Sequence, residues 1–149
     1  MKDILRDFLE EGKKALQVVP FDFFPSPEEA KGNYGILPLF YTQWAASKSL
    51  LLRSDEIVTC LGGLTEFSKK IIAVRDILGE SLLPAHFKEV GNSFTQSYYR
   101  PGWKHFYLRD FGSVFPDFDC FENVPDTPDN LMKIAALVSG RFEEWQLQK

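Results

Sequence analysis

The stretch TPDNLMKIAALVSGRFEEW, residues 127–145, carries the clearest structural signal in the chain. It opens with Thr127, Pro128 and Asp129, which are typical of a capped helix start with proline in the first position and an acid in the first turn. The residues that follow place large apolar groups at three- and four-residue intervals, as one buried helix face requires: Leu131, Ile134, Ala135, Val138, Phe142 and Trp145. We therefore predict a docked helix over residues 128–146.

Four more segments show the same 3.6-residue period with caps or breakers at their ends, and the pattern predicts helices over 3–16, 38–52, 65–78 and 84–97. Two short stretches stay open between helix and strand, 54–61 and 103–108. The expected fold is mostly α, a compact bundle of about five helices with long aromatic and acidic loops and room for a short β element near 103–108. The expected core consists of Phe8, Phe40, Trp44, Phe67, Ile71, Val74, Ile134, Val138 and Phe142.

Length and composition indicate one globular domain, residues 1–149. The chain is 44% hydrophobic and 26% charged, which is ordinary for a folded domain. No apolar run approaches the roughly 20 residues that span a bilayer, and the first residues alternate charged and apolar groups, so we expect a cytoplasmic protein without membrane contact. Cys60 and Cys120 are too few for a disulfide framework and lack the paired spacing of a zinc site, so reduced thiols are expected.

No motif for catalysis, a cofactor or a metal is recognisable. Gly62 and Gly63 lack the lysine and the spacing of a phosphate-binding loop. His86 and His105 do not form a metal-ligand pair, and nothing local activates either thiol as a nucleophile. We therefore nominate no catalytic residue, no metal ligand and no cofactor.

Charge is distributed unevenly along the chain. No Lys or Arg occurs between Arg109 and Lys133, whereas six acids do, and the remainder of the chain holds 15 acidic against 17 basic residues. This segment therefore accounts for the whole net charge of −4. It also contains four phenylalanines, and residues 21–29 repeat the combination of rings and carboxylates with no basic residue between Lys14 and Lys31.

Carboxylates steer a basic partner and aromatic rings supply binding energy once water is excluded, so the two acidic aromatic segments are predicted to form one recognition surface. The alternative is a solvated acidic loop whose phenylalanines return to the core. The residues nominated for partner binding are Asp117, Phe118, Asp119, Phe121, Glu122, Asp126, Asp22 and Phe23.

The opposite pattern occurs just upstream, in YYRPGWKH, residues 98–105, where cations alternate with aromatic rings. Such a stretch can track nucleic acid, but three cations make a small footprint on a net-acidic chain, so nucleic-acid binding is not favoured.

The whole profile is what one expects of a small acidic inhibitor, such as an immunity protein that neutralises a basic toxin nuclease, although no motif carries a family. A regulatory or scaffold subunit of a larger complex would show the same lack of chemistry. A small enzyme with an unrecognised site around His105, Cys120 and the acidic loop is the third possibility. The oligomeric state stays open.

Overall fold

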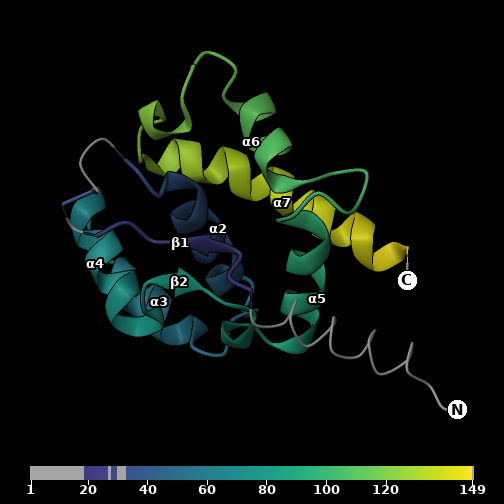
Figure 1. Cartoon of the computed structure of the whole chain (residues 1–149), viewed down its shortest axis with the longest axis horizontal. Coiled ribbons are helices and arrows are strands. Elements are labelled where there is room, and N and C mark those ends of the chain that lie inside the picture. Colours follow the sequence, from purple (N-terminus) through teal and green to yellow (C-terminus); the bar gives the residue numbers. More distant parts are fainter. Residues whose placement is uncertain (1–18, 27, 30–32, 149) are drawn as a thin grey trace, which may run out of the picture.

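The helix α2 (Ile36–Ser47) forms the centre of the computed structural model, which describes residues 19–26, 28–29 and 33–148 (Figure 1). Nine of its 12 residues are buried, including Phe40, Tyr41 and Trp44. A helix that is apolar on every side must be covered on every side, and the other elements of the fold provide that cover.

The remaining helices surround α2. Figure 1 shows α3 and α4 on one side of it and α7 on the other, and α6 packs against α7. Their bounds are α3 (Ser54–Leu61), α4 (Phe67–Leu78), α5 (Glu89–Tyr98), α6 (Tyr107–Val114) and α7 (Pro128–Leu147), with short 3-10 helices η1 (Pro84–His86) and η2 (Phe121–Asn123). None of the described helices has the length and apolar character that crossing a bilayer requires.

Two short strands fasten the segment before α2 to the core. In an antiparallel pair, β1 (Asp22–Phe23) lies against β2 (Ser81–Leu82), with Asp22 opposite Leu82. The backbone N–H groups of Phe21 and Phe24 donate to the carbonyls of Leu82 and Glu80, both at 2.8 Å. Phe21 and Phe24 are buried, whereas Phe23 between them stays exposed.

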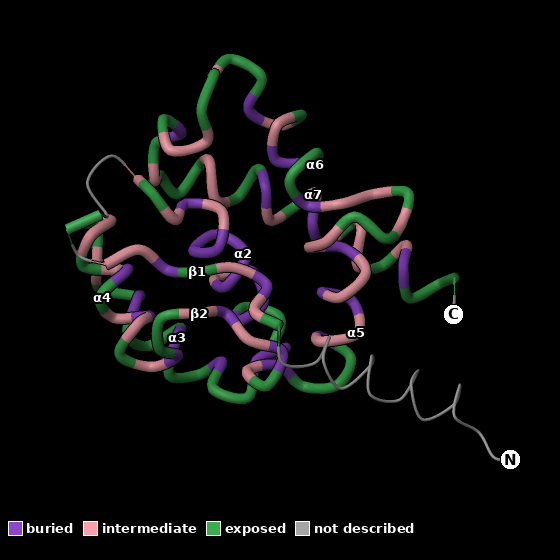
Figure 2. The backbone as a smooth tube through the Cα atoms, in the orientation of Figure 1, coloured by how far each residue is buried: buried purple, intermediate pink, exposed green. Residues whose placement is uncertain are grey.

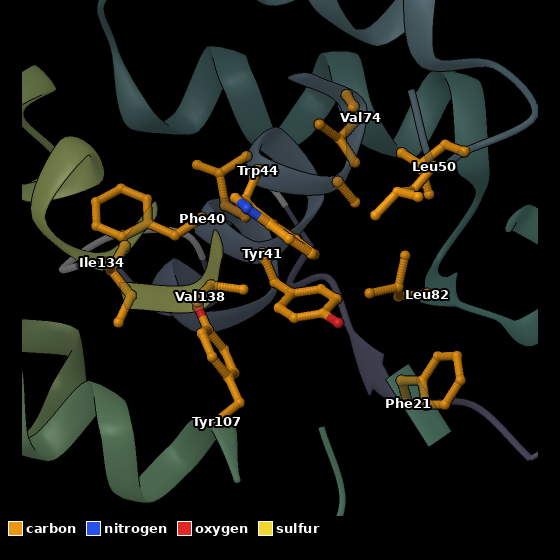
Figure 3. Close-up of a cluster of buried hydrophobic side chains, with 14 of the residues drawn as sticks. Phe21, Phe40, Tyr41, Trp44, Leu50, Val74, Leu82, Tyr107, Ile134 and Val138 are labelled. Atoms are coloured by element: carbon orange, nitrogen blue, oxygen red, sulfur yellow. The ribbon is translucent and has the colours of Figure 1, made fainter. Parts of the chain in front are cut away.

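The mostly α fold predicted from the sequence is confirmed. The segments predicted as helices at 38–52, 65–78, 84–97 and 128–146 overlap α2, α4, α5 and α7, and the undecided stretch 54–61 is the helix α3. The predicted helix 3–16 and the core residue Phe8 lie outside the described residues. The other predicted core side chains are buried, except that Phe67 and Phe142 are only partly buried against the cluster drawn in Figure 3.

Three boundaries differ from the sequence-based expectation. No strand forms over 103–108; α6 begins at Tyr107 instead, because Tyr107 and Phe111 bury their rings one helical turn apart. The helix predicted to reach residue 52 ends at Ser47, where Ser49 adopts a left-handed φ of 58° and the N–H of Leu50 returns to the carbonyl of Ala45. The segment predicted as a helix from 84 starts as the 3-10 turn η1, and α5 follows it.

Candidate functional site

The fold brings the two acidic aromatic segments of the sequence to one hollow. Asp22 and Phe23 come from β1, and Phe121 and Glu122 come from η2, about a hundred residues later. The hollow has a volume of about 170 Å³ and is completed by the turn and first residues of α2: Asn33, Tyr34, Gly35, Ile36, Leu37 and Pro38. We call these ten residues the acidic aromatic pocket.

On the β1 side, the carboxylate of Asp22 is held in place by two donors. The backbone N–H of Phe23 donates to Oδ1 at 2.8 Å, and the Tyr99 hydroxyl donates to Oδ2 at 2.5 Å. Burial, and next the charge of Asp22, raise the pKa of Tyr99 well above its ordinary range, so the phenol keeps its proton. The neighbouring ring of Phe23 is 63% exposed.

The turn before α2 contributes a second exposed aromatic residue, Tyr34, to the pocket that Phe23 lines. Tyr34 is 53% exposed at the tip of this turn. On one flank, Asn33 has a left-handed φ of 61°, and its side-chain amide donates to the carbonyl of Val124 at 2.9 Å. On the other flank, Gly35 has φ 91°, and a Cβ there would stand 2.4 Å from the Cδ of Pro25. The turn is therefore tied both to the segment after η2 and to the segment after β1.

On the η2 side, the aromatic residue of the pocket is largely fixed by packing. Phe121 is partly buried, and its ring meets that of Phe111 edge-on with centroids 5.4 Å apart. Glu122 is half-buried and has no ion-pair partner among the described residues. Its charge is therefore available to a ligand in the pocket.

The other nominated residues divide into two groups. Asp117 and Asp119 are exposed on the loop between α6 and η2, and neither forms an ion pair within the described part of the chain (Figure 2). Phe118 turns back and packs on the core. The side chain of Asp126 is only 6% exposed and pairs with Lys70 at 2.9 Å. Asp126 thus stabilises the fold internally, and we leave it out of the pocket.

A second polar cluster, which includes the histidine of the enzyme alternative, joins α6 to α7. Buried Asp110 accepts from the Tyr98 hydroxyl at 2.7 Å and from Nε of Arg141 at 2.9 Å. Arg141 also lies 3.2 Å from Nε2 of His105, which is 3.5 Å from Glu144. These groups satisfy one another across the helix interface, as a structural network does.

His105 interacts with Arg141 and Glu144, whereas Cys120 and Cys60 are exposed free thiols. Within residues 19–26, 28–29 and 33–148, no group of three or more His, Cys, Asp or Glu side chains is placed to hold a metal ion.

A separate hollow of about 200 Å³ lies where α2, α3 and α7 meet. It has no charged lining residue among those described, and Val58 on its rim is 52% exposed. It is lined by Gln43, Ala46, Ile57, Val58, Leu61, Gly62 and Leu131. This apolar hollow differs from the acidic aromatic pocket in both composition and place.

Comparison with models of protein families, with curated proteins and with solved structures finds no match to this chain. The function has to be argued from its own residues. Of these, sequence reasoning missed Tyr34. The signal was present, since an aromatic residue between Asn33 and Gly35 stands among residues that favour a left-handed turn and therefore sits at a turn tip.

Proposed function

We propose that this chain is a non-catalytic module that binds a basic protein through the acidic aromatic pocket and the adjoining loop with Asp117 and Asp119. The observation that carries the proposal is the meeting of β1 and η2 around one hollow. Two largely exposed rings, Phe23 and Tyr34, stand there beside the carboxylates of Asp22 and Glu122.

The physical basis is that charged and aromatic residues contribute to binding in different ways. Carboxylates that no cation neutralises extend their field into solvent and speed the encounter with a basic surface. Exposed aromatic rings lose water on contact and so supply most of the binding energy of an interface. Neither ring needs to move out of the core for this, because Phe23 and Tyr34 are already exposed.

The specific form of the proposal is an inhibitor or immunity protein for a basic, nuclease-like toxin. An active site that holds phosphates is lined with cations, and a surface with carboxylates at similar spacing can occupy it or its rim. Fast, electrostatically steered capture is what protection from a lethal enzyme demands.

A scaffold subunit of a larger complex is the second candidate. The observation that favours it is the apolar hollow between α2, α3 and α7, because obligate partners bury apolar surface. The two candidates predict different contact surfaces, so one set of variants separates them.

The test is affinity capture from the native cell with full-length bait, followed by binding kinetics on the purified partner. We expect the double variant Asp117→Lys and Asp119→Lys to slow association by roughly tenfold or more at low salt, and Phe23→Ala to speed dissociation. A control of equal charge change, Glu89→Lys with Glu143→Lys, alters exposed acids on α5 and α7. It should leave the kinetics near those of the wild type.

Two results would count against the proposal. One is a partner that binds the loop and Phe23 variants with wild-type kinetics. The other is a captured partner whose binding is abolished by Val58→Asp but not by the loop or Phe23 variants. That result would assign binding to the apolar hollow and support the scaffold function. Circular dichroism of each variant checks that the fold persists, since exposed charges contribute little to stability.

A further inference from the structure

We infer that the acidic aromatic pocket receives one arginine side chain of the partner. The inference rests on the proposed function and specifies which group the partner inserts. It starts from the shape of the pocket, which is a small hollow and not a flat acidic surface, with a volume of about 170 Å³.

The lining matches a guanidinium group in chemistry. Aromatic residues from three separate segments line the pocket, Phe23, Tyr34 and Phe121, and two carboxylates, Asp22 and Glu122, belong to the same lining. A planar guanidinium stacks on aromatic faces and donates its edge N–H groups to carboxylates. No Lys or Arg occurs among the described lining residues, so the described part of the chain does not fill the pocket with a cation of its own.

Both carboxylates keep the capacity to accept further hydrogen bonds. Each oxygen of Asp22 accepts one described hydrogen bond, from Phe23 or Tyr99, and a carboxylate oxygen has room for a second donor. Glu122 has no ion-pair partner among the described residues. An incoming cation with several N–H donors can therefore hydrogen-bond to carboxylate oxygens of Asp22 and Glu122 that still have room for a donor.

Arginine is preferred over lysine for two reasons. A guanidinium is more weakly hydrated than an ammonium, so entering a half-enclosed aromatic pocket costs it less. Its five N–H donors also point in several fixed directions and can serve more than one acceptor, whereas an ammonium is a point charge. The chain itself shows this contact nearby, because the guanidinium carbon of Arg100 stands 4.5 Å from the ring centroid of Phe21.

The test is an NMR titration of the full-length, nitrogen-15-labelled protein with three small probes: N-acetyl-arginine methylamide, its lysine counterpart and its neutral isostere, the citrulline counterpart. We expect saturable millimolar binding of the arginine probe, with shifts concentrated at Phe23, Gly35 and Glu122. The lysine probe should bind several-fold more weakly and the citrulline probe should not saturate. Glu122→Gln should weaken arginine binding about threefold to fivefold, as loss of one partly exposed charge pair does.

The matched control is Glu89→Gln, which neutralises an exposed carboxylate on α5 and should not change binding of the arginine probe. Equal shifts from arginine and citrulline, shifts spread over exposed acids such as Asp117, or wild-type binding by Glu122→Gln would overturn the inference. If Glu122→Gln loses its dispersed spectrum, the comparison of the three probes on the wild type decides alone.

The outcomes also separate this inference from the proposed function. A basic protein whose capture depends on Phe23, together with an arginine probe that does not bind, would refute the arginine pocket and leave the proposed function standing. Specific binding of the arginine probe without capture of any basic protein would refute the proposed function instead.

Discussion

Alkaline pH is expected to unfold this protein steeply, because its core encloses several tyrosine hydroxyls. Tyr41, Tyr98 and Tyr107 are buried, and Tyr99 packs beside them with its hydroxyl on Asp22. Burial is the first cause that raises the pKa of each of the four phenols well above the ordinary value. In the folded protein these groups therefore stay protonated at a pH where the unfolded chain ionises them.

The sign and the size follow from proton linkage. A raised pKa in the folded state gives stability that is fully present below the unfolded pKa of about 10 and is lost as pH rises above it. Each such tyrosine contributes a slope that approaches about 1.4 kcal/mol per pH unit once the pH is well above 10. Because the phenols of the unfolded chain are only half ionised at pH 10, the three buried rings together lower the free energy of unfolding by about 3 kcal/mol between pH 10 and pH 11, and Tyr99 adds to this. The whole free energy of unfolding of a folded protein is only about 5–15 kcal/mol.

Urea denaturation at intervals from pH 8 to pH 11.5 measures this slope, and absorbance at 295 nm reports phenolate formation. The free energy of unfolding should be flat up to about pH 9.5 and then fall, with ionisation of the four enclosed tyrosines coinciding with loss of helix signal. Tyr107→Phe should reduce the slope by about 1.4 kcal/mol per pH unit, after a small constant loss from its hydrogen bond to the Leu37 carbonyl. Ionisation of the buried tyrosines in a protein that remains folded would refute the reasoning.

Two further predictions concern stability, one at the polar cluster between α6 and α7 and one at a glycine that lines the pocket. Arg141→Met should lower the free energy of unfolding measured with urea by about 3 kcal/mol, because it leaves buried Asp110 without its ion-pair partner. The control Lys133→Met on the same helix should change it by less than about 0.5 kcal/mol. Equal effects of the two variants would contradict the structural role of the pair. Gly35→Ala should destabilise by about 1–3 kcal/mol, since its φ is 91° and the proline ring beside it leaves no space, whereas Gly140→Ala in α7 has open space and should stabilise by about 0.5–1 kcal/mol. A stable Gly35→Ala protein would show that the turn relaxes.

Local pattern was enough to predict most of the helices. Over residues 128–146 the apolar spacing and the Thr127 cap agree, and α7 forms with the Thr127 side chain accepting from the N–H of Asn130. Both signals act within a few residues of each other, so sequence reasoning can evaluate them without knowing the fold. The stretch 103–108 had no such period, and the start of α6 at Tyr107 depends on the core that receives its ring.

The composition of the chain also identified the segments that bear the candidate site, but it could not say which of their residues face outward. Asp117 and Asp126 look alike in the sequence, and only the fold shows one exposed and the other paired with Lys70, 56 residues away. The pocket itself depends on equally distant links, between Asn33 and Val124 and between Asp22 and Tyr99. The periodic spacing of a helix depends on residues that are neighbours in the sequence. The partner of a charged side chain depends on which remote segments pack together. For that reason only the tertiary structure could show how the site is assembled.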